Sequence, residues 1–271
     1  MSRRIGLRSK AASPVFPLLT KSIHIPGVLK VKRHMRCAIF ADIHGNLEAL
    51  EAALGCAGKR QVTRFMVLGD SIGYGANPNE CLEWAIKNAS LHVLGNHEAA
   101  ILHREILDRF THPAREAIDW VAGRLRPELV RAVRGLPYLH VEGNIALAHG
   151  TLHSSERFYY LSTEGDAYRS FLATQACFGF VAHTHVSAFF SEKSRSGGYL
   201  GEGVLKLNAN ERYLLNPGSI GQPRDGDHRL SFGIFDEGEL TFEILRLPYD
   251  NKTAAQKIRS AGLPESLADR L

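Results

Sequence analysis

Apolar and polar residues alternate along this chain in a pattern that is typical of β-α-β units. Residues 37–44 (CAIFADIH) and 65–70 (FMVLGD) form apolar runs of strand length, each ending in polar side chains. Between them, residues 46–58 place leucines at helical spacing. The run at residues 91–95 predicts a further strand, so the chain opens with strands and helices in alternation.

The middle of the chain is predicted to be mainly helical. A helix is expected over residues 77–88, which open with Asn-Pro, since proline is favoured in a first helical turn. Residues 96–135 also have a helical pattern, and Pro113 and Pro127 divide them into two or three helices. The first of these is predicted to run from Glu98 to Phe110.

The second half is richer in short apolar runs and therefore in predicted strands. A hairpin is expected around Gly143, and one helix, over residues 164–176, interrupts the strands. Residues 191–203 are rich in Gly and Ser, which predicts a mobile loop. The tail from Lys252 has a helical pattern with a break at Pro264.

Together these elements predict an α/β fold. Helix-rich β-α-β units followed by a strand-rich half favour a four-layer α/β/β/α sandwich, in which two mixed sheets pack face to face and helices flank them. The sequence contains no internal repeat and no clear linker. We therefore expect residues 35–271 to form one domain.

Residues 1–34 differ in charge from the rest of the chain. They hold eight basic and no acidic residues, while the remainder is mildly acidic, with 25 basic against 28 acidic residues. We expect this leader to be disordered, and three interpretations of it remain open: a start codon chosen upstream of Met35, a basic arm that contacts nucleic acid or anionic lipid, or an organelle presequence. The rest of the chain lacks the excess of basic residues that would indicate nucleic-acid binding.

The four cysteines carry no metal or disulfide signature. Cys37, Cys56, Cys81 and Cys177 are scattered without CxxC spacing, so free thiols and a reducing cytoplasm are the expectation. No stretch of about 18 apolar residues is present, so no transmembrane helix is predicted.

Five short polar clusters follow the predicted strands, where ligands bind in open α/β sheets. Each alone has an ordinary explanation as a cap, a turn or a hydrogen-bonded histidine. Asp42 and His44, two positions apart on one extended segment, would project the same way, and so would His183 and His185 if their segment stays extended. The clusters are Asp42-Ile43-His44, Gly69-Asp70, Gly95-Asn96-His97-Glu98, His149-Gly150 and His183-Thr184-His185.

In combination, the clusters predict a metal site. They offer oxygen and nitrogen donors without thiolate, a set that suits Mn, Fe, Zn or Ni. The number of donors favours two ions over one. The identity of the metal is left open by these residues.

The order of these clusters resembles that of a known family, the calcineurin-like metallophosphoesterases. The family order is Asp-x-His, Gly-Asp, Gly-Asn-His-Asp/Glu, His and Gly-His-x-His, and all five occur here in that order. The segments DIHGNLEAL, LGDSIGYGANPNEC, NPGSIGQPRDGD and LPYDNKTAAQKIRSAGLPESLADRL further resemble a bacterial and archaeal branch of small phosphodiesterases. The resemblance covers about residues 36–271.

The resemblance implies a dinuclear-metal hydrolase that cleaves phosphate esters, most readily phosphodiesters, by attack of a metal-bridging hydroxide. It implies that His97 faces the phosphate, steadies charge in the transition state and assists the leaving alkoxide. The implied ligands are Asp42, His44 and His185 for the first ion, Asn96, His149 and His183 for the second, and Asp70 between them.

Two positions depart from the general family pattern. The family often reads Gly-Asp-x-x-Asp, with the second carboxylate orienting the catalytic imidazole, but Gly73 stands at that position here. His97 must therefore find another orienting partner or work without one. The glycine of Gly-His-x-His is replaced by Ala182, from which we expect little effect.

Three residues outside the ligand set are candidates for substrate contact. The segment 216–224 (NPGSIGQPR) could be a simple turn, or its N–H groups, Ser219 and the guanidinium of Arg224 could bind a substrate phosphate. Tyr74, close after Asp70, is a weaker candidate.

The function predicted from the sequence is therefore hydrolysis of a small phosphate ester in the cytoplasm. Two alternatives remain: a scaffold or binding module of the same fold that has lost catalysis, and a nuclease tethered to nucleic acid by the basic leader. The sequence fixes neither the physiological substrate nor the oligomeric state.

Overall fold

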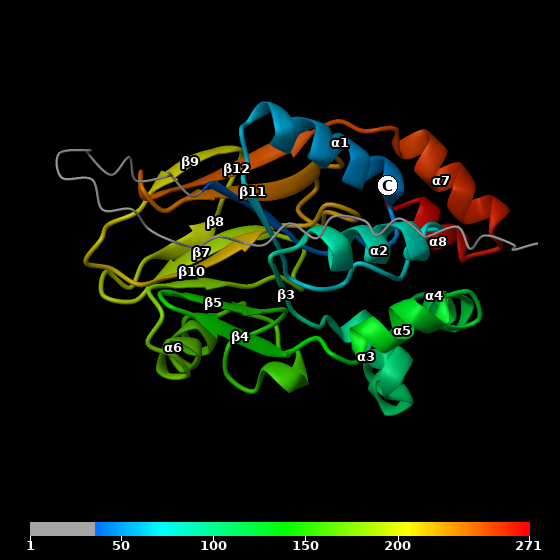
Figure 1. The fold of residues 1–271 in the computed structure, drawn as a ribbon, viewed down its shortest axis with the longest axis horizontal. Helices are drawn as coiled ribbons and strands as arrows, with labels where there is room; N and C mark the ends of the chain where they lie inside the picture. The colour runs from blue at the N-terminus through cyan, green and yellow to red at the C-terminus, as the bar shows by residue number, and fades with distance from the viewer. Residues whose placement is uncertain (1–35) are drawn as a thin grey trace, which may run out of the picture. The chain divides into compact units, whose positions relative to one another are not determined.

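The computed structural model describes residues 36–271, which form two mixed sheets of six strands flanked by helices (Figure 1). The predicted α/β/β/α sandwich is thus confirmed. In the first sheet β1, β2 and β3 are parallel, and β11, β12 and β9 continue it in antiparallel pairs. Its spatial order is β3 (Leu91–His92), β2 (Arg64–Val67), β1 (Arg36–Phe40), β11 (Leu230–Asp236), β12 (Thr241–Leu247) and β9 (Gly203–Lys206).

The second sheet is also mixed, but its parallel strands lie in the centre and its antiparallel pairs at the edges. Strands β5, β6 and β10 are parallel, whereas β4, β7 and β8 pair antiparallel to their neighbours. Its order is β4 (Leu139–Glu142), β5 (Ile145–Ala148), β6 (Phe178–Phe180), β10 (Tyr213–Pro217), β7 (Ser187–Ser191) and β8 (Gly197–Tyr199).

Helices cover the outer faces of both sheets. In Figure 1, α1 and α7 lie beside the β11–β12 sheet and α6 lies beside the β4–β5 sheet. The helices are α1 (Leu47–Lys59), α2 (Pro78–Asn88), α3 (Asn96–Leu102), α4 (His112–Ala122), α5 (Pro127–Val133), α6 (Glu164–Leu172), α7 (Asn251–Ser260) and α8 (Glu265–Ala268), with 3-10 turns η1 (Arg104–Arg109) and η2 (Ser155–Arg157).

The main core lies between the two sheets. Ile39 of β1, Leu147 of β5 and Phe235 of β11 are buried in one cluster, and the Phe180 and Phe235 rings pack edge to face with their centroids 5.2 Å apart. Burial of this apolar surface holds the sheets together, at about 25 cal/mol for each Å² removed from water. It also fixes where the carboxyl ends of the parallel strands meet.

A separate cluster joins the C-terminal helices to the middle of the chain. Ile258 of α7 and Leu267 of α8 are buried with Tyr74, and Phe110 packs against the same group. The indole N–H of Trp120 in α4 donates to the carbonyl of Ala261 at 3.0 Å. The predicted tail helices with a break at Pro264 are therefore confirmed, and they support α4.

The structure corrects three predictions of element extent. The helix predicted to end at Phe110 ends at Leu102, because His103 is extended (φ −133°, ψ 90°) and a 3-10 turn follows. Helix α6 ends at Leu172 and not at residue 176. Part of the predicted mobile loop 191–203 is strand β8, where Gly197 allows close pairing, since a Cβ there would lie 2.7 Å from the Phe190 ring.

Other predictions agree with the structure. The proline-bounded helices, the hairpin at Gly143 and four free thiols are all observed, and Cys37 and Cys81 are buried, while the other two are half-buried. Burial raises the pKa of Cys37 to about 11. None of the helices within residues 36–271 is long and apolar enough to cross a bilayer. The predicted leader, residues 1–34, lies outside the described residues.

Candidate metal centre

Four of the five polar clusters lie in loops that follow β1, β2, β5 and β6, and the fifth, Gly95-Asn96-His97-Glu98, follows β3 at the start of α3. The backbone there is not extended: Asp42, His44, Asp70, His183 and His185 have φ between 50° and 70°, in the left-handed region. The extended geometry predicted for the Asp-x-His and His-x-His pairs is therefore wrong. Asp42 and His44 nevertheless lie in one donor group, whereas His183 and His185 lie in two different groups. Left-handed non-glycine residues are strained, and such strain concentrates at functional sites.

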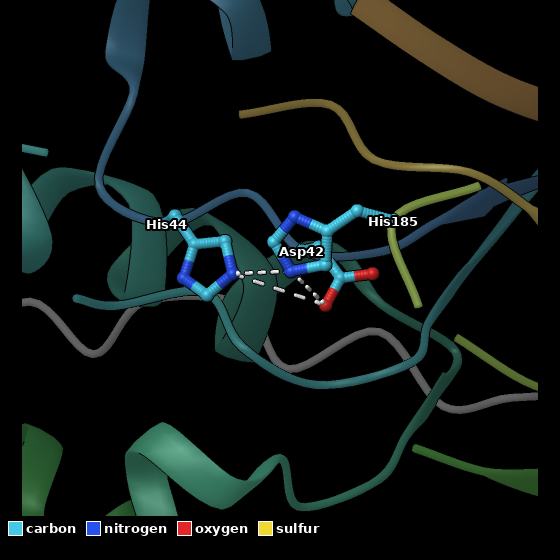
Figure 2. Close-up of side chains that lie close together, drawn as sticks. All are labelled: Asp42, His44 and His185. Atoms are coloured by element: carbon cyan, nitrogen blue, oxygen red, sulfur yellow. Dashed lines mark hydrogen bonds and ion pairs between the residues drawn. The ribbon is translucent and has the colours of Figure 1, made fainter. Parts of the chain in front are cut away.

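The first group of donors is Asp42, His44 and His185, all buried (Figure 2). Nε2 of His44 and Nε2 of His185 lie 3.1 Å apart. Asp42 Oδ1 lies 3.4 Å from the His185 nitrogen and 3.9 Å from that of His44. The loops after β1 and β6 therefore place three donor atoms around one point.

The protonation of these rings indicates what the group can bind. Nδ1 of His44 lies 3.0 Å from the Ile72 carbonyl, and Nδ1 of His185 lies 2.6 Å from the Gln222 carbonyl. A carbonyl only accepts hydrogen bonds, so each Nδ1 carries the proton. Burial lowers the pKa of both rings well below the usual value, so both are neutral.

The Nε2 atoms of both rings therefore carry lone pairs that face each other. They also face Asp42 Oδ1, a carboxylate oxygen that has no hydrogen-bond partner among the described residues. Neither neutral ring has a proton on Nε2 to donate to the other. A divalent cation satisfies all three donors at once, and the carbonyl partners of Nδ1 orient the imidazoles as metal-ligating histidines require. The donor set thus fits a cation.

The second group is formed by Asp70, His149 and His183, together with Asn96. Nε2 of His149 lies 3.1 Å from His183 Nδ1, 3.0 Å from Asn96 Oδ1 and 3.3 Å from Asp70 Oδ2. Nδ1 of His149 faces the Leu68 carbonyl at 2.7 Å, so Nε2 again points at the other donors. Nitrogen and oxygen donors converge here as in the first group.

Asp70 lies between the two groups. Its Oδ2 is 3.3 Å from Nε2 of His149 and 3.7 Å from Nε2 of His44. Its Oδ1 accepts a hydrogen bond from the backbone N–H of His97 at 2.9 Å. One carboxylate is thus shared by both candidate groups.

The charges of the buried groups are strongly coupled. Burial raises the pKa of Asp42 to about 7. Burial also acts to raise the pKa of Asp70, but the neighbouring His149 and His97 rings outweigh it and hold the pKa well below the usual value. For His149, burial is outweighed by the Asp70 carboxylate, which raises the pKa to about 9. Protons and cations therefore compete for the same donor atoms.

The His97 ring occupies the space where a side chain at position 73 would lie. A Cβ at Gly73 would lie 2.0 Å from His97 Nδ1, and the residue has φ +90°, so no side chain can stand there without displacing the ring. His97 Nδ1 is buried and has no hydrogen-bond partner among the described residues. Instead the ring packs against Tyr74 and Phe110, with centroids 4.6 and 4.9 Å away. Aromatic packing thus holds His97 in place of a carboxylate.

A cavity of about 1220 Å³ opens onto both groups. Asp70, Asn96, His97, His183 and His185 lie in its wall. So do Tyr74 and Arg224, whose guanidinium Nη2 donates to the tyrosine hydroxyl at 3.3 Å. The cavity gives a ligand access to the donors.

Comparison with known proteins identifies the family. Residues 35–239 match the calcineurin-like phosphoesterase superfamily domain. The chain belongs to this superfamily. It is 38% identical over 239 residues to an uncharacterised protein of Methanocaldococcus jannaschii, a match that covers 86% of this chain and 96% of the relative.

Solved structures agree with the assignment to the superfamily. A metallophosphoesterase from Sphaerobacter thermophilus is 36% identical, with a TM-score of 0.79 over 88% of this chain and 98% of that one. A hypothetical protein from Pyrococcus horikoshii, 18% identical, shares the fold with a TM-score of 0.70 over 87% of this chain and 96% of its own.

The structure brings together all seven ligands predicted for this superfamily member, and places His97, Tyr74 and Arg224 at the same cavity. It does not bring Ser219 there. That residue is fully buried, and its hydroxyl donates to the Asp42 carbonyl at 2.9 Å. Ala182 is likewise buried, and its N–H donates to the His149 carbonyl.

Sequence reasoning gave no role to Glu98, the last residue of the Gly-Asn-His-Glu cluster. Its carboxylate accepts hydrogen bonds from the N–H groups of Asp70, Ser71 and Ile72, at 2.9, 2.6 and 3.3 Å. Burial and the nearby Asp70 charge raise the pKa of Glu98. Glu98 therefore fixes the loop that carries Asp70, and its place in the motif was the signal that could have revealed it.

Replacing Glu98 with Gln should loosen this loop, because an amide N–H₂ would face a backbone donor. We expect a loss of about 1–3 kcal/mol in the free energy of unfolding and metal affinity about 10–100-fold weaker, measured by denaturant titration and metal titration. The exposed Glu51→Gln in α1 serves as control, with a change within about 0.5 kcal/mol. Wild-type values for the Glu98 variant would contradict this role.

Proposed function

We propose that this phosphoesterase hydrolyses phosphodiesters with the help of two divalent cations. The observation that supports this most directly is the pair of donor groups on either side of Asp70, with imidazole nitrogens directed inward. Asp42, His44 and His185 would hold one cation, and Asn96, His149 and His183 the other. Mn, Fe, Zn and Ni all suit such donors.

The cations, when bound, supply Lewis acidity that polarises phosphate oxygens and acidifies water. The reaction itself is a hydrolysis. Water provides the new oxygen on phosphorus, the bond from phosphorus to the leaving oxygen breaks, and that oxygen takes up a proton. The protein must therefore bind the phosphate, orient it and supply hydrogen-bond donors where charge develops.

Two side chains at the cavity suit these tasks. His97 lies with Nε2 3.9 Å from Asp70 Oδ2, next to the donor groups. Burial lowers the pKa of His97 to about 4, so the neutral ring would act mainly by donating an N–H to a phosphate oxygen. The Arg224 guanidinium, held by Tyr74, would bind a second phosphate oxygen, since guanidinium groups match phosphate geometry.

The size of the cavity supports a diester over a monoester. A volume of about 1220 Å³ leaves room for organic groups on both sides of one phosphate. A diester also brings less negative charge to the two carboxylates than a monoester dianion. The metal identity and the cytoplasmic location stay predictions.

Removal of metal tests the proposal. Protein stripped with chelator should lose hydrolysis of bis(p-nitrophenyl) phosphate, and one of Mn, Fe, Zn or Ni should restore it at two ions per chain, measured by elemental analysis. Turnover should exceed that of p-nitrophenyl phosphate under the same conditions. Unchanged activity after complete stripping would reject the proposal, and tight metal binding without any turnover would favour a non-catalytic binding module.

A further inference from the structure

The cavity extends beyond the candidate metal groups, along a wall that the proposed hydrolysis does not use. Arg109, at the end of η1, and Arg157, at the end of η2, both lie in this wall. So do Tyr159 and Tyr160, which follow η2. We call these four residues the distal wall.

Tyr160 provides a fixed aromatic surface next to the donor groups. Its ring stacks on the His183 ring, with centroids 4.2 Å apart and an interplanar angle of 9°. Even so, Tyr160 is 50% exposed, and its neighbour Tyr159 is 49% exposed. Two adjacent tyrosines held open to solvent in a cavity are typical of a surface that packs against a planar ligand.

The backbone holds these tyrosines against the loop that carries His149. The N–H of Thr151 donates to the Tyr159 carbonyl at 3.0 Å, and a Cβ at Gly150 would lie 2.6 Å from the same oxygen. Ser154 and Phe158, which bracket η2, both have left-handed φ, at 47° and 53°. The turn that carries Arg157, Tyr159 and Tyr160 is thus strained, and it is hydrogen-bonded to the loop that carries His149.

The arginines of the wall give it positive charge. Arg109 Nη1 donates to the Arg157 carbonyl at 3.3 Å, which joins η1 to η2, and no carboxylate in residues 36–271 lies within 4 Å of the Arg109 guanidinium. Within residues 36–271, Arg157 pairs only with Glu156 at 3.8 Å, and both side chains are more than half exposed, so that pairing is weak.

The other acidic groups of the cavity already have partners. Glu105 lies 3.8 Å from His103, and Asp269 pairs with Arg259 at 2.9 Å. The arginines of the distal wall are therefore available to an anionic ligand.

We propose that the distal wall is a binding subsite for the leaving half of the substrate, and that this half carries a planar ring and a second phosphate, as in a dinucleotide with a terminal phosphate. The ring stacks on Tyr160, and the second phosphate binds Arg157 and Arg109. This inference rests on the proposed phosphodiester hydrolysis and names its substrate class.

Paired substrates test the subsite. The dinucleotides pTpT and TpT share one scissile diester and differ in a 5′-terminal phosphate, which lies on the leaving half when the bond from phosphorus to O3′ breaks, so kcat/KM should be about tenfold higher for pTpT, through KM. In the Arg109→Ala/Arg157→Ala double variant, the ratio of kcat/KM for pTpT to that for TpT should fall to about one. Tyr160→Ala should raise KM for both dinucleotides by about tenfold, and Tyr160→Phe should restore it, because the ring and not the hydroxyl stacks.

Matched controls lie outside the cavity. Arg131→Ala in α5 and Tyr168→Ala in α6, the latter 64% exposed, should retain the wild-type preference and KM. Equal kcat/KM for pTpT and TpT in the wild type, or an unchanged preference in the double variant, would overturn the subsite. If the wild type also fails to hydrolyse bis(p-nitrophenyl) phosphate, the proposed function itself has failed.

Discussion

Replacing Asp70 with Asn is expected to abolish both metal loading and turnover. Asp70 Oδ2 lies 3.3 Å from His149 Nε2 and 3.7 Å from His44 Nε2, so this carboxylate is placed to serve both donor groups. The amide keeps the shape and the acceptor for the His97 N–H but removes the negative charge. Cation content should fall from two per chain to one or none, and kcat/KM for bis(p-nitrophenyl) phosphate by about 1000-fold.

The control for Asp70→Asn is the same exchange at an exposed carboxylate away from the cavity. Asp108→Asn, in η1, should leave metal content and turnover unchanged. Circular dichroism of both variants would show whether the fold is kept. Two bound ions and full turnover in Asp70→Asn would show that Asp70 does not serve as the shared donor.

Replacing Gly73 with Ala is expected to reduce turnover nearly as much as loss of the imidazole itself. The added Cβ would lie 2.0 Å from His97 Nδ1, so the ring must leave its place between Tyr74 and Phe110. We expect kcat to fall by about 100-fold, the lower end of what removal of one preorganised hydrogen-bond donor costs. Metal content, measured by elemental analysis, should stay at the wild-type value, because His97 is not among the proposed ligands.

Two comparisons separate displacement of His97 from backbone strain. Gly262→Ala places alanine at φ +70° with nothing within 4 Å of the new Cβ, so it should cost some stability and leave kcat unchanged. The double variant Gly73→Ala/His97→Ala should be no slower than His97→Ala alone, since both changes remove the same ring. Additive losses in kcat would show that Gly73→Ala acts by some route other than displacement of the His97 ring.

Much of the fold and of the donor set could be predicted from the sequence, because both depend on local signals. Short apolar runs predicted the strands. Five of these runs were followed by a polar cluster, and the folded sheets bring these clusters together. The ordered motifs added specificity that no single Asp or His provides. The carboxyl ends of neighbouring parallel strands lie side by side in each sheet, and the two sheets pack face to face, so clusters that are far apart in the sequence meet at one site.

Other features depend on contacts that leave no local trace. The left-handed φ of Asp42 and His44 is set by bonds to the next loop, such as the His44 N–H to the Asp70 carbonyl at 2.9 Å, and not by residue type. Likewise, Phe110 and Tyr160 lie far along the chain from the rings on which they pack. The sequence suggested that Ser219 contacts substrate, but its side chain is buried, because a hydroxyl that follows a Pro-Gly turn can face inward as readily as outward.

The cluster that joins α7 and α8 to Tyr74 and Phe110 connects residues 251–271 to the packing around His97, although they lie beyond the segment that matches the superfamily. Relatives could keep every metal-binding motif and yet position the imidazole differently if their C-terminal helices diverged. Evolution could therefore alter the position of this ring from outside the donor loops, by repacking α7 and α8.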